Sequence, residues 1–283
     1  MDSFDHFNLT NPLQNAIDDL GFTIPTPIQS SVFSVIRSGK DVVGIAQTGT
    51  GKTLAYMLPI LQDLKFAETN NPRIALLVPT RELVLQLAVN IESFTKHTNL
   101  RVLGVYGGTN ISTQKNAVLE GVDIIVATPG RFYDLAVSGI LQLKKINKLV
   151  IDEVDVMLDL GFRTQINNIL DILPQRRQNI MFSATMTEDV DKLIDDFFIK
   201  PEKIAIAVSG TPLENISQVC YEVKNFYTKL NLLKYLLGNK EEYSKVLVFS
   251  SNKKNADLLF ENLEEDFASE ICIIHSNKSQ NYP

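Results

Sequence analysis

The stretch Ala46-Gln47-Thr48-Gly49-Thr50-Gly51-Lys52-Thr53 is the most informative part of this sequence. The apolar segment 41–45 before it is typical of a short buried strand, and an apolar helical face begins after it at Leu54. Glycines lack a Cβ, so their backbone amides can close around phosphate oxygens at a helix N-terminus. The stretch therefore predicts a phosphate-binding loop between a strand and a helix.

The side chains at the end of this loop suit a nucleotide and a metal ion. We expect Lys52 to reach the β- and γ-phosphates and the Thr53 hydroxyl to bind Mg²⁺. Ala46 departs from the general pattern, which has glycine at that position. An ordinary helix-capping turn is the alternative, and the strand-loop-helix context disfavours it.

Short apolar runs alternate with amphipathic helical patterns from about residue 41 onward. This alternation predicts an α/β fold, a parallel sheet with helices on both faces. The further strands are expected at Ile74–Val78, Arg101–Tyr106, Asp123–Ala127, Lys148–Ile151, Asn179–Phe182 and Lys203–Ile206. The clearest helical patterns are Arg81–Thr95, Ile111–Leu119, Phe162–Leu173 and Glu188–Phe198.

Several polar motifs follow directly on these strands. They are the phosphate-binding loop, Pro79-Thr80-Arg81, Thr128-Pro129-Gly130-Arg131, Asp152-Glu153 and Ser183-Ala184-Thr185. Ligands of parallel α/β sheets bind at the carboxyl ends of the strands. We therefore expect these motifs to gather at one edge of the sheet as a single site.

The acidic pair Asp152-Glu153 ends the apolar strand 148–151. One carboxylate at that place suits a Mg²⁺ ligand, and the second suits a base that orients water. A solvated acidic turn is the alternative. The phosphate-binding loop upstream supports a functional role for the pair. We therefore predict that Asp152 binds the metal and that Glu153 orients the attacking water.

Composition gives no sign of a nucleic-acid arm, a membrane span or a disulfide framework. The 283 residues carry a formal net charge of −6 and only two cysteines, Cys220 and Cys272. Two well-separated cysteines fit a reducing compartment. The first residues lack the pattern of a signal peptide, and no apolar run reaches the length of a membrane span. We expect a cytoplasmic protein that does not contact membranes.

A second αβ pattern follows residues 207–218, which are polar and read as a linker. Strands are expected at Val219–Val223, Lys245–Phe249 and Ile271–Ile274, with helices at Lys229–Leu237 and Asn255–Leu263. These elements are too few for a doubly covered sheet to bury both faces. We expect an incomplete domain with an unpaired sheet edge.

From Phe4 to about residue 280 the chain resembles the DEAD-box ATP-dependent RNA helicases of superfamily 2. Asp152-Glu153-Val154-Asp155 stands for their name-giving motif, with Val154 in the alanine position. The resemblance implies a Q motif in residues 1–30, a first RecA-like domain at 31–206 and an incomplete second one at 219–283. Within the Q motif, Gln29 would recognise adenine and Phe22 would stack on it. The implied cofactors are ATP and Mg²⁺.

The resemblance also implies that RNA is the partner. Its backbone would be bound, largely without regard to sequence, by Pro79, Thr80, Arg81, Gly107, Gly108, Thr128, Pro129, Gly130 and Arg131. Each of these motifs taken alone is more typical of a turn or a cap. Ser183 and Thr185 resemble the motif that couples ATP hydrolysis to strand separation, within reach of Asp155.

The chain departs from the family pattern at its end. Two motifs of the second domain, which supply an arginine finger and RNA contacts, are not found, and Pro283 stands where the family has arginine. We therefore expect an N-terminal fragment or a frame-disrupted product, which binds ATP with little unwinding activity. Two alternatives stay open: a non-catalytic module that binds ATP and RNA, and a helicase that acts on DNA.

Overall fold

The computed structural model describes residues 3–64, 69–206, 216–275 and 277. The chain divides into two compact units, Met1–Thr211 and Pro212–Pro283. Most of the predicted linker, residues 207–215, lies outside the described residues, as does the predicted terminal motif at 280–283. In the described ranges, no helix combines the length and the apolar character that a membrane crossing requires.

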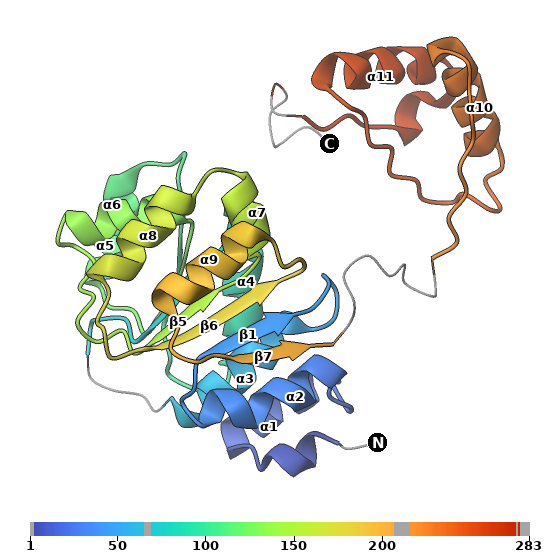
Figure 1. Ribbon diagram of the computed structural model, residues 1–283. Helices are drawn as coiled ribbons and strands as arrows, with labels where there is room; N and C mark the ends of the chain where they lie inside the picture. The colour runs from blue at the N-terminus through green and yellow to red at the C-terminus, as the bar shows by residue number, and fades with distance from the viewer. Residues whose placement is uncertain (1–2, 65–68, 207–215, 276, 278–283) are drawn as a thin grey trace. The chain divides into compact units, whose positions relative to one another are not determined.

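The first unit is built on a seven-stranded parallel sheet in the order β3-β4-β2-β5-β6-β1-β7 (Figure 1). Its strands are β1 (Val42–Ile45), β2 (Ile74–Leu77), β3 (Val102–Val105), β4 (Ile124–Ala127), β5 (Lys148–Ile151), β6 (Gln178–Ser183) and β7 (Glu202–Ala205). Every predicted strand of this unit is confirmed, and the bounds differ by no more than one residue. The predicted α/β fold with a parallel sheet is therefore correct.

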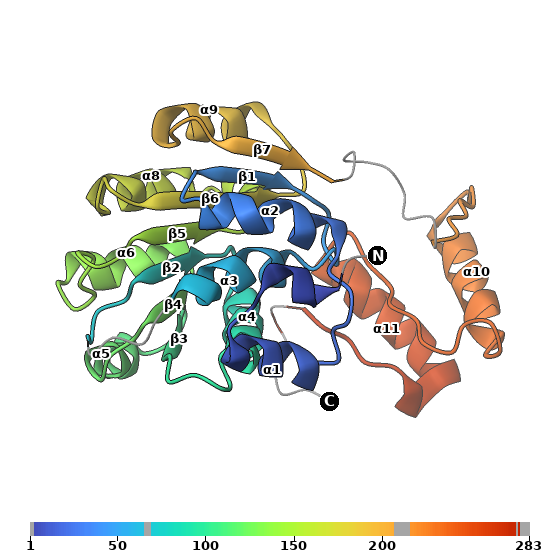
Figure 2. The ribbon, with the colours of Figure 1, turned by 90° about the horizontal axis from the view of Figure 1, so that it is seen from below.

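Helices cover both faces of this sheet. One face carries α1 (Asn11–Asp19), α2 (Pro27–Arg37), α3 (Lys52–Asp63) and α4 (Arg81–Phe94), which lie in front of the strands in Figure 2. The other face carries α5 (Ile111–Leu119), α6 (Pro129–Val137), α7 (Val154–Asp159), α8 (Arg163–Ile172) and α9 (Glu188–Phe197). A short 3-10 helix, η1 (Phe4–Phe7), precedes α1.

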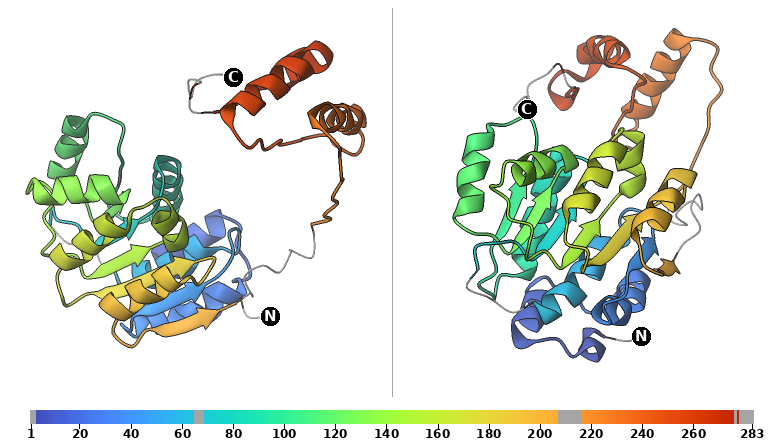
Figure 3. Two further views of the ribbon diagram at one scale, coloured as in Figure 1. Left: turned by 45° about the horizontal axis from the view of Figure 1, so that its top comes forward. Right: turned by 60° about the vertical axis from the view of Figure 1, so that its left-hand side comes forward.

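Two apolar cores result from the alternation of side chains along the strands. Val42 packs into the core beside α2 and α3, whereas the next residue, Val43, packs into the core on the other face. Ile124 and Ile125 of β4 divide in the same way. Successive side chains of a strand point to opposite faces, so apolar runs without alternation are what a doubly covered sheet needs. The two views of Figure 3 show this layered unit from other sides.

The second unit differs from the prediction in its strands. Its helices are α10 (Phe226–Gly238), α11 (Lys253–Phe267) and the 3-10 helix η2 (Ala268–Glu270), and both predicted helices lie inside α10 and α11. The segments 219–223, 245–249 and 271–274 have no strand assignment. The prediction of three strands there was therefore wrong. Their β-branched residues produce a strand pattern, but a strand also needs a hydrogen-bonded neighbour, and the described residues provide none.

Candidate nucleotide and nucleic-acid site

The motifs predicted to form one site do lie along one edge of the sheet. The strands are parallel, so the loops that follow them all leave at the carboxyl edge. Backbone hydrogen bonds join neighbouring loops there: Ala46 N–H donates to the Ser183 carbonyl at 3.0 Å, and Asp152 N–H donates to the Leu77 carbonyl at 3.0 Å. The predicted convergence of these motifs is confirmed.

The order of the strands divides this edge into two halves. The loops after β5, β6 and β1 carry the acidic pair, Ser183-Ala184-Thr185 and the phosphate-binding loop, and these strands are neighbours. The loops after β3, β4 and β2 carry Gly107-Gly108, Thr128-Pro129-Gly130-Arg131 and Pro79-Thr80-Arg81, and these strands are also neighbours. We call them the phosphate-loop half and the basic half.

The phosphate-binding loop has the backbone geometry that glycine allows. Gly49 and Gly51 have φ angles of +82° and +84°, a region that other residues rarely adopt. Lys52 is the first residue of α3, and its buried Nζ donates to the Ala46 carbonyl at 3.2 Å. The Thr50 hydroxyl donates to the Gln47 carbonyl at 2.8 Å, which holds the turn around Thr48. A helix N-terminus and a lysine therefore meet at this loop, an arrangement that favours anions.

Gln29 fixes the phosphate-binding loop against the start of α2. Its Oε1 accepts from Thr26 N–H at 2.9 Å, and its Nε2 donates to the Gly51 carbonyl at 3.2 Å. A Cβ at Gly51 would lie 2.6 Å from that Nε2, so a side chain there would displace the Gln29 amide as well as strain the backbone at a φ of +84°. A primary amide offers two donors and two acceptor sites, so each end of Gln29 keeps one for a ligand. Phe22 nearby in the sequence is 43% exposed.

The two predicted metal ligands, Thr53 and Asp152, both interact with the hydroxyl of Tyr56, a residue that we did not predict to belong to the site. Tyr56 of α3 is fully buried, and its hydroxyl donates to Asp152 Oδ2 at 3.0 Å. The same hydroxyl interacts with the Thr53 side chain. Thr53 and Asp152 thus offer hydroxyl and carboxylate oxygens at one place, and hard oxygen donors of this kind suit Mg²⁺. The residues present fit the metal.

Burial changes the acidity of the two carboxylates. Desolvation raises the pKa of Asp152 above its ordinary value, and the positive charge of Lys52 opposes part of that rise. Desolvation also raises the pKa of Glu153, and the neighbouring charge of Asp152 adds to the effect. Both carboxylates would therefore gain from a cation beside them. A raised pKa also brings Glu153 closer to the range of a general base.

Glu153 has an unusual backbone conformation. Its φ of +56° lies in the left-handed region, although it is neither glycine nor asparagine. It directly precedes the first residue of α7. Strained conformations of this kind persist only where the surrounding structure enforces them, and they cluster at functional sites.

Asp155 connects the acidic motif with the loop after β6. Its Oδ2 accepts hydrogen bonds from the backbone N–H of Thr185 at 2.9 Å and from the Thr185 hydroxyl at 2.8 Å. The Ser183 hydroxyl does not reach Asp155 and donates to the Thr185 carbonyl at 2.7 Å. The structure therefore joins Asp155 to Thr185 directly and to Ser183 only through Thr185.

The basic half presents fewer free side chains than the sequence suggested. The Thr80 hydroxyl accepts from Leu83 N–H at 3.2 Å as the N-cap of α4, and Thr128 and Pro129 begin α6. Arg131 is only 8% exposed and donates to Gln114 and to the Thr109 carbonyl. Its guanidinium is therefore directed into the protein, and the predicted contact between Arg131 and the RNA backbone stays a prediction.

Arg81 and the glycines of the basic half remain at least partly exposed. The guanidinium carbon of Arg81 lies 5.0 Å from the centre of the Tyr106 ring, a cation–π geometry. At Gly107, Gly108 and Gly130 an added Cβ would meet no atom within 4 Å, so a ligand can approach the backbone there. Pro79 belongs to the same edge but is buried, like Val78 before it, so its predicted contact with RNA stays a prediction.

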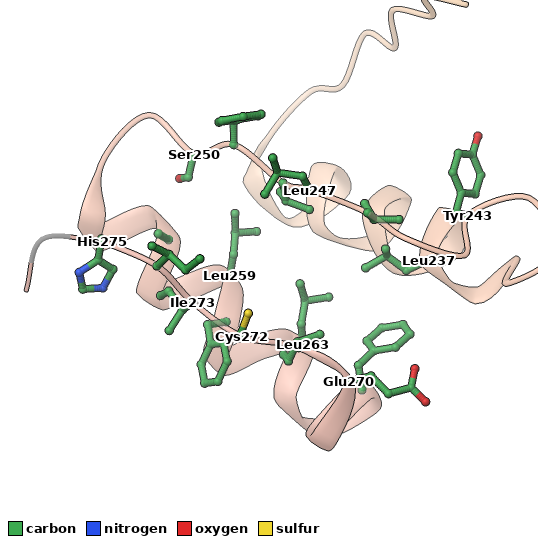
Figure 4. A pocket seen from close by; sticks show the side chains of 18 of the residues that line it. Leu237, Tyr243, Leu247, Ser250, Leu259, Leu263, Glu270, Cys272, Ile273 and His275 are labelled. Atoms are coloured by element: carbon green, nitrogen blue, oxygen red, sulfur yellow. The ribbon is translucent and has the colours of Figure 1, made fainter. Parts of the chain in front are cut away.

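A separate cavity lies wholly within the second unit. It has a volume of about 990 Å³ and is lined mainly by apolar side chains (Figure 4). Its labelled residues come from α10, α11, η2 and the segments beside them, for example Leu237, Leu259, Leu263, Leu247 and Ile273. It contains no phosphate-binding loop and no acidic pair, so we assign it no part in the chemistry of the first unit.

The chain is similar to several known proteins. It is 35% identical over 98% of its length to "DEAD-box ATP-dependent RNA helicase 46" of Arabidopsis thaliana, of which it spans 43%. It is 38% identical over 93% of its length to "ATP-dependent RNA helicase RhlB" of Pseudomonas syringae pv. tomato, of which it spans 68%. Most of the relatives described by name are matched over half their length or less.

Solved structures and a family profile agree with these relatives. The crystal structure of a DEAD box protein from the hyperthermophile Methanococcus jannaschii has a TM-score of 0.69 and 33% identity, and covers 98% of this chain and 74% of that one. The profile of the DEAD/DEAH box helicases matches residues 26–193, which contain the phosphate-binding loop, both halves of the sheet edge and the acidic pair. The chain therefore belongs to the DEAD/DEAH box helicase family.

Proposed function

We propose that this chain binds ATP with Mg²⁺ at the phosphate-loop half and the RNA backbone at the basic half, as part of an ATP-dependent RNA helicase. The observation that carries the proposal is the meeting of Thr53 and Asp152 at the Tyr56 hydroxyl, beside the phosphate-binding loop. A phosphate loop alone suits many anions. Its combination with a buried oxygen pair suits a metal-bound nucleoside triphosphate.

Each side chain of the phosphate-loop half takes one role in this proposal. Lys52 contacts the β- and γ-phosphates, while Thr53 and Asp152 hold the metal. Bound Mg²⁺ would supply positive charge that stabilises the transferring phosphoryl group. Glu153 accepts a proton from the attacking water, a role that its raised pKa supports. Gln29 uses its remaining donor and acceptor on the adenine edge, and Phe22 stacks on the base.

The basic half would recognise RNA through its backbone. Threonine hydroxyls, strand-end amides and the Arg81 guanidinium match phosphate oxygens, and glycines allow close approach. Contacts of this kind carry no base information, so binding should be largely independent of sequence. The hydrogen bonds between Asp155 and Thr185 are suited to relay the state of the nucleotide site to the loop after β6.

We also propose a cytoplasmic location. The free, exposed thiols of Cys220 and Cys272 support it, because reducing compartments keep thiols in that form.

A competition experiment tests the proposed function. Fluorescent ADP is displaced from the chain by ATP or by GTP, and a labelled single-stranded RNA is displaced by unlabelled RNA or by DNA of the same sequence. We expect ATP to compete better than GTP, and RNA better than DNA. Equal displacement by DNA would favour a helicase that acts on DNA. Binding of both ligands with no phosphate release, with or without RNA, would favour a non-catalytic module.

A further inference from the structure

Gln114 of α5 joins two parts of the loop that follows β3. Its Nε2 donates to the Tyr106 carbonyl at 3.2 Å and to the Thr109 hydroxyl at 2.9 Å. These two residues flank Gly107 and Gly108, and Gly108 has a φ of +77°. A loop with two glycines has many conformations available to it. The two hydrogen bonds from Gln114 hold both ends of the glycine pair in one of them.

The loop after β4 fixes the orientation of the Gln114 amide. Arg131 Nη1 donates to Gln114 Oε1 at 2.7 Å, and Arg131 Nη2 donates to the Thr109 carbonyl at 3.0 Å. Rotating the amide by 180° would place its NH₂ group against the guanidinium, which has no acceptor. Arg131 is 8% exposed, so its charge depends on these partners for hydrogen bonding.

The same loop also supports the loop after β2. The Tyr106 ring lies 5.0 Å below the guanidinium carbon of Arg81, and the Tyr106 carbonyl is the group that Gln114 holds. The Gln114 amide therefore contacts the loop after β3 and Arg131 of α6 directly, and it is linked to Arg81 of α4 only through Tyr106.

We propose that Gln114 is a positioning residue for RNA binding, which holds the glycine loop and Arg81 in the arrangement that accepts the RNA backbone. The proposal rests on the proposed function of the basic half. A surface ordered in advance loses less conformational entropy when it binds its ligand. Gln114 need not touch RNA itself. It belongs to none of the motifs that the sequence pointed to.

Two substitutions distinguish the acceptor role of the Gln114 amide from its donor role. Gln114→Ala removes all three hydrogen bonds. Gln114→Glu keeps an acceptor for Arg131 but cannot donate to Tyr106 or Thr109. Asn116→Ala is the matched control, because it removes an exposed amide from the same helix. For each 283-residue chain we would measure the affinity for labelled single-stranded RNA, the affinity for fluorescent ADP, and amide hydrogen exchange.

We expect Gln114→Ala and Gln114→Glu each to weaken RNA binding about tenfold, because both lose the two hydrogen bonds that hold the glycine loop. ADP affinity should change less than twofold, since the phosphate-binding loop lies in the other half. Hydrogen exchange should rise at residues 106–109 and stay unchanged in the strands. Asn116→Ala should match the unmodified chain in all three measurements.

Three results would overturn the proposal. One is unchanged RNA affinity in Gln114→Ala while the unmodified chain binds RNA, which would leave the proposed function intact. Another is an equal loss of RNA and ADP affinity, which would make Gln114 a general stabilising residue. The third is unchanged exchange at residues 106–109. If the unmodified chain bound no RNA, the proposed function would fail together with this proposal.

Discussion

The hydroxyl of Tyr56 donates a hydrogen bond to Asp152 Oδ2 at 3.0 Å, inside a core where neither side chain is more than 6% exposed. Tyr56 lies one helical turn after Thr53, and Asp152 follows β5. This contact joins the helix of the phosphate-binding loop to the acidic motif. It fixes one oxygen of Asp152 and leaves the other to accept the backbone N–H of Glu153 at 3.0 Å.

Tyr56→Phe should loosen Asp152 without creating a cavity. A hydrogen bond to a charged group contributes about 1.5–3 kcal/mol, so we expect the free energy of unfolding to fall by about that amount. ADP affinity should fall more in the presence of Mg²⁺ than in its absence. Urea unfolding and titration with fluorescent ADP measure the two effects. Tyr227→Phe, at a site 74% exposed, is the control, and identical behaviour of the two variants would contradict the assignment.

Gln29→Glu should remove the preference for adenine. The carboxylate still accepts from Thr26 N–H, so the start of α2 keeps its cap. It cannot donate to the Gly51 carbonyl or to an adenine edge. We expect the affinity ratio of ATP to GTP to approach one, because an unpaired buried polar group costs about 1–3 kcal/mol. A variant that keeps the ratio of the unmodified chain would disprove the role of Gln29 in base selection.

Glu153→Gln should separate binding from hydrolysis. The amide has nearly the same shape as the carboxylate but cannot accept the proton of the attacking water. General base catalysis contributes about 10²–10⁴ in rate, so RNA-stimulated phosphate release should fall by at least about 100-fold. ATP affinity should stay within a few-fold of that of the unmodified chain. A variant with lower ATP affinity and an unchanged hydrolysis rate would reverse this assignment.

Asp123 should make the stability of the first unit depend on acid pH. It is fully buried and accepts from Arg73 at 2.9 Å and from Arg101 Nε at 3.0 Å. Burial by itself would raise the pKa of Asp123, but the hydrogen bonds from Arg101 and Arg73 outweigh it and lower that pKa. A lowered folded-state pKa stabilises the protein above the unfolded pKa of about 3.9, and this stabilisation is lost as the pH falls further.

Asp123→Asn tests this dependence. At pH 7 the variant should be less stable than the unmodified chain, because the two arginines lose their charged partner. Between about pH 5 and pH 2 its free energy of unfolding should fall less steeply than that of the unmodified chain. Urea unfolding at several pH values measures both slopes. Parallel curves would show that Asp123 does not titrate in this range.

The sequence predicted the first unit well because its signals are local. Buried strands such as Lys148–Ile151 are continuous apolar runs, and each is followed by a polar motif at the point where the strand ends. Parallel pairing then brings those motifs together whatever the details of packing. The phosphate-binding loop could also be predicted from the sequence, because its glycines, Gly49 and Gly51, have the positive φ angles that favour glycine.

The residues that sequence reasoning missed act through contacts between distant segments. Tyr56 looked like part of an apolar helical face, and only the approach of β5 shows its hydroxyl to be a partner of Asp152. Gln114 looked like an ordinary polar residue of a surface helix. Its position four residues after Asn110, the N-cap of α5, gives a weak signal that it reaches back over the preceding loop.

The prediction of strands in the second unit was wrong for a related reason. Segments such as Lys245–Phe249 have the composition of a buried strand, yet Leu247 and Phe249 are 75% and 88% exposed. The composition of a segment shows how well it would pack as a strand in a sheet. It does not show whether a neighbouring strand is present to pair with it.

In the proposed function, nucleotide and RNA bind to different halves of one sheet edge. Its most direct test is to measure the affinities for Mg²⁺-bound fluorescent ADP and for single-stranded RNA in Lys52→Ala and Arg81→Ala. We predict that Lys52→Ala weakens ADP binding about tenfold or more and leaves RNA binding in the absence of nucleotide unchanged, and that Arg81→Ala does the reverse. Loss of both affinities in either variant, or loss of RNA binding in Lys52→Ala alone, would contradict the account.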